Sequence, residues 1–249
     1  MDGTAIMEKV RAAYAHCPSY QDTGDVVCVF IHDGPPPRRR TTSRPFSTWF
    51  VRPNRFRFES ARRDIGPPEE WNRHVVWERD GVARSWWSIR GEKEPMDLSR
   101  LLAGATGISG GAAHRIPHLL MPERFKPGVA PQVSLAGLET IADIACHKLE
   151  LAWEWEDHQH SELWWVGVDD SLIRREYNLK HLGDKKQHEL INANLRKLLA
   201  EGKIEESRFQ ALLRPLEDLE PFRVESTTSY KPSVGIEIAD ETFDFTPPA

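Results

Sequence analysis

The sequence lacks any apolar run close to the about 20 residues that a membrane-spanning helix needs. Its first five residues contain no basic segment and no apolar segment, so they do not have the pattern of a signal peptide. Either the protein is cytoplasmic or the chain begins after a removed signal. Cysteine is also scarce: Cys17, Cys28 and Cys146 have no C-x-x-C spacing, which argues against zinc. Cys28 and Cys146 could pair if their strands meet, but buried free thiols are favoured.

Catalytic motifs are missing as well. The chain has no H-E-x-x-H and no phosphate-binding loop, and its glycine-rich stretch Ile108-Ser109-Gly110-Gly111 does not follow a strand in a βαβ unit. The series His158, His160 and Glu162 offers metal-ligand types, but it straddles a turn predicted at 157–161 and lacks a further fixed ligand. A solvated turn is therefore the interpretation. The sequence predicts no enzyme, no catalytic residue, no metal and no cofactor.

Charge of one sign is not in excess. The net charge of -5 and the isoelectric point near 6.1 give no general attraction to nucleic acid. The basic triplet at 38–40 follows three prolines and is interpreted as a solvated loop. Arg55 and Arg57 alternate with aromatics, but pairing with carboxylates such as Glu59 or Glu78 explains them better than an oligonucleotide does.

Strand patterns dominate what is present. The 249 residues suit one domain. Strands are predicted at 25–32, 46–51, 55–60, 72–79, 82–90, 139–156, 162–168, 172–182, 222–230 and 242–245. Asp80-Gly81 is a good hairpin turn. Phe56 and Phe58 point to one face while Arg55 and Arg57 point to the other, as in a half-solvated antiparallel sheet.

One face of the 147–155 run is apolar or aromatic throughout. Its members alternate along the strand: His147, Leu149, Leu151, Trp153 and Trp155. A face of this kind must be covered, either by the protein's own helices or by an apolar guest.

Three segments have helical patterns. The first is 4–16, with Thr4 as the expected N-cap. The second, 98–121, is rich in glycine and alanine and predicts one or two short helices with a loose middle. The third, 184–216, predicts two helical pieces broken near Gly202. This third segment either packs on its own sheet or forms a docking surface for a protein partner or a second copy.

A set of short motifs follows these elements in order along the chain. They are Tyr20-x-Asp22-x-Gly24, Phe50-x-Arg52-Pro53-x-Arg55-Phe56-Arg57-Phe58, Ile116-Pro117-x-Leu119-Leu120, Leu163-Trp164-x-x-x-x-Asp169, Thr227-Thr228-x-Tyr230 and Phe243-x-Phe245-x-Pro247-Pro248. Together they resemble the lipoprotein-carrier (LolA/LolB-like) superfamily, particularly its uncharacterised, predicted periplasmic branch of outer-membrane lipoprotein-sorting-like proteins.

The resemblance implies an α+β fold with a curved antiparallel half-barrel sheet of nine to eleven strands, wrapped around helices. It implies a single LolA-like domain over 1–249, with a helical insertion at about 184–216. Members of the superfamily bind acyl chains of lipoproteins or sense them, so the implied partner is a lipid or lipidated protein. The resemblance also implies an extracytoplasmic, periplasmic location.

The resulting hypothesis is a noncatalytic binding protein with an aromatic-lined half-barrel cavity. The predicted ligand-binding residues come from the strands and from the 98–121 segment: Trp49, Phe56, Phe58, Trp87, Leu101, Ile108, Leu119, Leu151, Trp153, Trp155 and Trp165. Two alternatives remain open: an ordinary core packed on helices, and a protein-interaction or sensor module whose cavity is self-filled. An open apolar pocket of about 300–1,000 Å³ beneath 98–121 would favour the binder, whereas a collapsed interior with an exposed apolar patch on the 184–216 helices would favour the module.

Overall fold

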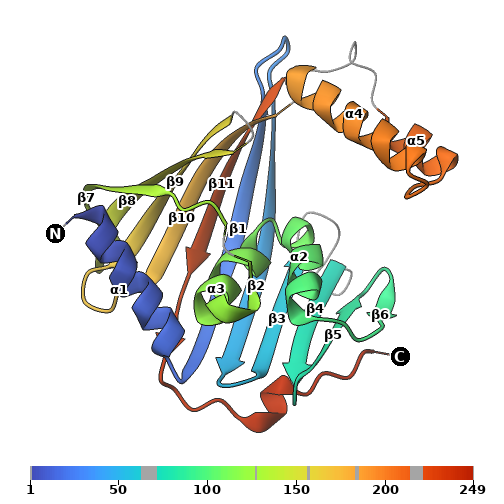
Figure 1. Cartoon of the computed structure of the whole chain (residues 1–249). Helices are drawn as coiled ribbons and strands as arrows, with labels where there is room; N and C mark the ends of the chain where they lie inside the picture. Colours follow the sequence, from blue (N-terminus) through green and yellow to red (C-terminus); the bar gives the residue numbers. More distant parts are fainter. Residues whose placement is uncertain are drawn as a thin grey trace. The chain divides into compact units, whose positions relative to one another are not determined.

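The chain forms a large, curved, unclosed antiparallel sheet, with the helices at 3–16, 98–108 and 112–120 against one face, as a computed structural model shows (Figure 1). The structure describes residues 2–62, 72–126, 128–155, 158–182, 185–213 and 221–248. The strand order is β6-β5-β4-β3-β2-β1-β11-β10-β9-β8-β7, with β12 pairing to β1. This arrangement confirms the predicted fold class, an α+β half-barrel.

The described residues contain twelve strands: β1 Ser19–His32, β2 Arg38–Val51, β3 Arg55–Arg62, β4 Asn72–Arg79, β5 Val82–Trp87, β6 Gly91–Lys93, β7 Gln132–Ile141, β8 Ile144–Trp155, β9 His158–Gly167, β10 Ile173–Leu182, β11 Phe222–Tyr230 and β12 Ser233–Val234. The helices are α1 Gly3–His16, α2 Leu98–Ile108, α3 Ala112–Leu120, α4 Lys185–Ala200 and α5 Glu206–Leu212, with 3-10 turns η2 Pro122–Arg124 and η4 Asp240–Phe243.

Helix α1 begins one residue earlier than the sequence pattern predicted. Asp2, rather than Thr4, is the N-cap, and its Oδ1 accepts a hydrogen bond from the Ala5 amide at 2.8 Å. The helix lies against β7. A Cβ at Gly3 would come within 2.8 Å of the Ser134 carbonyl carbon, so glycine permits this close approach.

The local turn predictions have mixed outcomes. The hairpin at Asp80-Gly81 is confirmed: both residues have positive φ, 53° and 79°, as a type I′ turn requires. The turn predicted at 157–161 is wrong, because β9 begins at His158 and pairs with β8. The short strand predicted at 242–245 is also wrong, because η4 occupies its start.

Two strands are longer than their apolar patterns indicated. β1 begins at Ser19 instead of residue 25, and β2 begins at Arg38 instead of residue 46. The basic triplet at 38–40 is therefore exposed strand and not loop. Polar residues can extend a ladder because the backbone supplies its hydrogen bonds, so apolar alternation marks only the buried part of a strand.

The chain divides into two compact units. One comprises residues 1–28, 42–178 and 226–249, and the other comprises 29–41 and 179–225. Within the second unit α4 contacts α5, with the break at Gly202, whose φ is 65°. The two helical pieces are thus confirmed within 185–212, while 184 and 214–216 lie outside the described residues. A single domain with an insertion stays a prediction.

Candidate functional site

Alternation along the strands separates an inner face, which meets α1, α2 and α3, from an outer face. On β2 and β3 the inner face carries Thr48, Phe50, Phe56 and Phe58, where Thr48 pairs with Phe58 and Phe50 with Phe56. Each of these four side chains is at most 1% exposed. The aromatic residues of the R-P-x-R-F-R-F run therefore form part of the core.

On the other arm of the sheet, β8 contributes Leu149, Leu151 and Trp153 to the inner face. Leu149 lies opposite Trp164 of β9, and Trp153 lies opposite His160, on which its ring stacks at 5.4 Å between centroids. Leu149 and Leu151 are buried. The predicted apolar alternation of the 147–155 run is thus confirmed as far as Trp153.

The structure brings most of the predicted ligand-binding residues to one side of the sheet. Those on the inner face or on the helices that cover it are Phe56, Phe58, Trp87, Leu101, Ile108, Leu119, Leu151 and Trp153. The side chain of Trp155 lies outside the described residues. The ligand-binding role of this set stays a prediction.

Two predicted residues lie on the outer face. Trp49 pairs with Arg57, and the Arg57 guanidinium carbon is 5.7 Å from the centroid of the Trp49 ring. The Lys148 ammonium nitrogen is 5.3 Å from the centroid of the Trp165 ring. Grouping them with Phe56 and Phe58 was wrong, because neighbouring positions on a strand face opposite ways. Of the adjacent pair at 164 and 165, Trp164 is the inner residue.

Helices α2 and α3, residues 98–120, fill the space over the inner face and are called the plug below (Figure 1). Their sheet-facing apolar side chains are 3% exposed or less: Leu98, Leu101, Leu102, Ala105, Ala112, Ala113, Ile116 and Leu120. The junction of the two helices is Gly110-Gly111, with φ of 69° and 107°. The predicted loose middle is thus a left-handed turn that favours glycine.

Two arginines hold the C-terminal end of the plug. The Arg52 guanidinium donates to the carbonyls of Cys17 at 2.9 Å and Leu120 at 2.7 Å, which ties α1 to α3. Arg124, just after the plug, makes a two-pronged ion pair with Glu78 of β4, with Nη2 to Oε1 at 2.9 Å. Glu78 is 1% exposed, so this pair is shielded from water.

A third arginine belongs to the plug itself and contacts the sheet. Arg115 of α3 pairs with Glu162 of β9, and its Nε lies 3.2 Å from Oε1 of Glu176 on β10. Its guanidinium carbon is 4.5 Å from the centroid of the Trp164 ring. The Trp164 indole N–H donates to Glu162 at 3.1 Å, which fixes that carboxylate.

Burial raises the pKa values of two acidic side chains in this region. Desolvation raises the pKa of Glu176 to about 7, although Arg115 and a hydrogen bond from Tyr230 act in the opposite direction. Desolvation likewise raises the pKa of Asp22 to about 6, and the Tyr20 hydroxyl donates to its Oδ2 at 2.8 Å. The centre of the inner face is therefore polar and charged, which the aromatic pattern did not predict.

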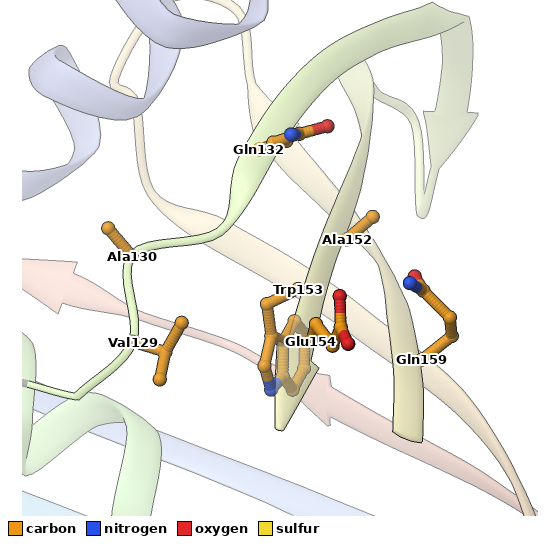
Figure 2. Close-up of a pocket in the computed structure, with 7 residues that line it drawn as sticks. All are labelled: Val129, Ala130, Gln132, Ala152, Trp153, Glu154 and Gln159. Carbon is orange, nitrogen blue, oxygen red and sulfur yellow. The ribbon is translucent and has the colours of Figure 1, made fainter. Parts of the chain in front are cut away.

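A separate pocket of about 290 Å³ opens at the end of β8 (Figure 2). Trp153 and Glu154 come from β8, Gln159 from β9, and Val129 and Ala130 from the segment before β7. Gln132 and Ala152 complete the lining. The pocket is mixed in polarity and does not lie beneath the plug.

Across the ranges given above, no group of three or more His, Cys, Asp or Glu side chains is arranged to hold a metal ion. Within the same ranges, no helix has the length and apolarity to cross a membrane. The three cysteines are free and buried.

These features define an α+β protein with an unclosed antiparallel sheet whose inner face is filled by its own helices. No family model matches the chain, and no curated protein sequence matches it. Solved structures similar to it include a DUF1329 family protein from Desulfovibrio piger, 12% identical over 97% of each chain, with a TM-score of 0.38. A LolA superfamily protein from Nitrosomonas europaea is 13% identical over 98% of each chain, with a TM-score of 0.33.

A third similar structure is the lipoprotein LppX of Mycobacterium tuberculosis. It is 10% identical and has a TM-score of 0.40; the alignment covers 94% of this chain and 96% of that protein. The superfamily that the motifs resemble is thus represented among the solved structures similar to this chain.

Proposed function

We propose that this protein is a noncatalytic binding protein that takes an apolar or lipidated ligand between the plug and the inner face. The observation that supports this most is the construction of the plug. It consists of helices of 11 and 9 residues joined by Gly110-Gly111, and α3 contains Pro117. Isolated helices shorter than about 12–15 residues are marginal in water, so the plug depends on its contacts with the sheet.

When a ligand replaces the plug, the free energies of burying their apolar groups are close to balanced. Burying one leucine or isoleucine side chain contributes about 1.5–3 kcal/mol, so releasing Leu101, Leu102, Ile116 and Leu120 costs on the order of 6–12 kcal/mol. An acyl chain of twelve carbons gains about 10 kcal/mol, at about 0.8 kcal/mol per buried CH₂. Burial of a lipid chain can therefore offset the release of these four side chains. The motif resemblance to lipoprotein carriers supports the same class of ligand.

Native mass spectrometry of the purified chain tests this proposal. Co-purified lipid should be visible as a mass increment. After its removal, dodecyl maltoside below its micelle concentration should bind saturably, with one chain per protein. A spectrum without increment, together with no saturable binding of the maltoside, would overturn the proposal.

The second candidate is a protein-interaction module that uses the helical pair α4 and α5. Ile191 of α4 is 45% exposed and Leu212 of α5 is 44% exposed. A contiguous apolar patch marks an interaction surface, and this candidate function requires Ile191 and Leu212 to belong to one such patch. Sedimentation of the chain and of the Ile191→Glu, Leu212→Glu variant distinguishes these options: a self-associating module loses its larger species in the variant, whereas a monomeric binder does not change.

A further inference from the structure

The inner face contains a complete set of groups for one cation, and the chain's own Arg115 occupies it. Glu162 and Glu176 approach the guanidinium from β9 and β10, and the Trp164 ring offers its face at 4.5 Å. The side chains of Glu162 and Glu176 are 14% and 12% exposed. Carboxylates and an aromatic face are the groups that bind ammonium and guanidinium ions.

The cation in this site belongs to the plug and not to the sheet. Arg115 belongs to α3, whereas both carboxylates and Trp164 belong to strands of the sheet. When a ligand displaces the plug, Arg115 leaves with it. Two carboxylates then remain on the inner face without their counter-ion, and an uncompensated buried charge is strongly unfavourable.

An apolar track lies directly beside this site. Leu151 is opposite Glu162, Leu149 is opposite Trp164, and Trp153 follows on the same face of β8. A ligand chain that runs along these residues places its polar end at the two carboxylates. A cationic end restores the balance of charge there, and an anionic end adds a third negative charge.

We propose that the ligand of this protein is an amphiphile with a cationic head, and that its head takes the place of the Arg115 guanidinium between Glu162, Glu176 and Trp164. This inference rests on the proposed function, because the head reaches the site only when the plug moves. Arg115 acts in the resting state as an internal substitute for that head.

The test compares three probes with the same twelve-carbon chain below their micelle concentrations: dodecylguanidinium, dodecyl sulfate and dodecyl maltoside. Binding to the full chain is measured by equilibrium dialysis at pH 8. Dodecylguanidinium should bind at least about tenfold more tightly than the other two. Arg115→Met should bind it more tightly than the wild type does, because the internal competitor is absent.

Site variants locate the preference. Glu162→Gln and Glu176→Gln should each reduce the ratio of dodecylguanidinium affinity to maltoside affinity. The matched control is Glu139→Gln, since Glu139 pairs with Lys148 and accepts from the Trp165 indole on the outer face of the same arm. That variant should retain the full preference.

The preference should also depend on pH. The groups that face Glu176 are Arg115 from α3, Glu162 from β9 and Tyr230 from β11, with Asp22 of β1 near Tyr230. Glu176 loses its proton as pH rises through about 7, so the preference should grow between pH 6 and pH 8. In Glu176→Gln this growth should disappear.

The outcomes separate the two claims. If none of the probes binds saturably, the proposed function fails and this inference fails with it. If maltoside or sulfate binds as tightly as dodecylguanidinium, only the cationic head is contradicted. A preference that survives in Glu162→Gln and Glu176→Gln but is lost in Glu139→Gln would place the cation on the outer face and overturn the assignment.

Discussion

At the scale of single residues, Gly24 of β1 shows how closely the inner face is packed. A Cβ added there would lie 2.2 Å from the Ser229 carbonyl oxygen and 2.3 Å from the Phe46 ring. Gly24→Ala must push apart two strands and a buried aromatic, and overpacking of this kind costs about 1–3 kcal/mol. Urea denaturation should show this loss in the free energy of unfolding.

Gly107 of α2 is the matched control for that substitution. Nothing lies within 4 Å of a Cβ added there, and no positive φ is recorded for it. Gly107→Ala should therefore leave stability unchanged or raise it by about 0.5–1 kcal/mol. Equal effects of the two alanines would contradict the packing described for Gly24. Gly110→Ala is not a neutral control, because its φ of 69° strains any other residue.

Glu176 predicts a specific dependence of stability on pH. Its folded pKa of about 7 lies above the ordinary glutamate value of 4.5, so the folded state binds the proton more tightly than the unfolded state does. Its contribution to stability is complete below pH 4.5 and is lost as pH rises to 7. The loss should be about 3 kcal/mol over this range, at about 1.4 kcal/mol per unit.

Denaturation of the wild type and of Glu176→Gln at several pH values measures this difference. The variant should lack the decline between pH 4.5 and 7 that the wild type shows relative to it. Parallel stability curves for the two proteins would mean that Glu176 titrates as an exposed carboxyl does.

The residue scale also shows what could be predicted from the sequence. Phe56 and Phe58 were assigned correctly to one face, because strict alternation with arginine fixes their direction. Trp165 was assigned to the wrong face, since two adjacent tryptophans give no sign of which one points inward. The register Leu149 to Trp164 decides this, and register depends on strand pairing rather than on composition.

At the scale of elements, Arg52 should control how firmly the plug is held. It is the side chain that joins the carbonyl of Leu120 on α3 to that of Cys17 after α1. Arg52→Met removes these charged hydrogen bonds, each worth about 1.5–3 kcal/mol. Hydrogen exchange in residues 98–120 should accelerate, and uptake of a fluorescent fatty-acyl probe should become faster.

Arg84→Met is the control, because Arg84 pairs with Glu92 at the exposed end of the sheet. It should change neither the exchange of the plug nor the rate of uptake. If Arg52→Met slows uptake or protects the plug from exchange, the role assigned to Arg52 is wrong.

Elements with strong patterns were predictable, and those that depend on tertiary pairing were not. The helical character of 98–121, predicted as one or two short helices, and the Asp80-Gly81 hairpin followed from the sequence. The strand β7 was not separated from β8, because its exposed, mixed sequence has little alternation and its register shifts between Leu135 and Gly137. The ionic cluster at Arg115 was missed because its members come from three elements distant in sequence.

At the scale of the whole molecule, the C-terminal segment closes the outer face of β3, β4 and β5. Phe243 is fully buried, and the Phe245 ring lies 4.9 Å from that of Trp77. Arg79 pairs with Asp240 at 2.8 Å and also with Asp244. The terminal Phe-x-Phe motif is thus a structural contact of the sheet.

Phe243→Ala should lower the free energy of unfolding by about 3–5 kcal/mol, as expected for a large buried aromatic. Because this residue lies on the opposite side of the sheet from the plug, dodecyl maltoside should bind with unchanged affinity at a temperature where the variant is folded. A variant of normal stability would contradict the packing of the segment. Loss of binding in a folded variant would contradict the placement of the ligand on the inner face.

The fold of the whole chain could be predicted from the sequence, because its motifs occur in order and each element agrees with the same sheet. What fills the inner face could not be predicted from the sequence. Whether helices or a guest fill a concave sheet depends on packing between distant segments, and the sequence left both options open.

The central claim is that a ligand replaces the plug on the inner face, and hydrogen exchange of residues 98–120 tests it most directly. Exchange is measured by mass spectrometry with and without saturating dodecyl maltoside. The account predicts that bound ligand accelerates exchange in the plug while β3 and β8 stay protected. Saturable binding that leaves the plug equally or better protected would contradict it.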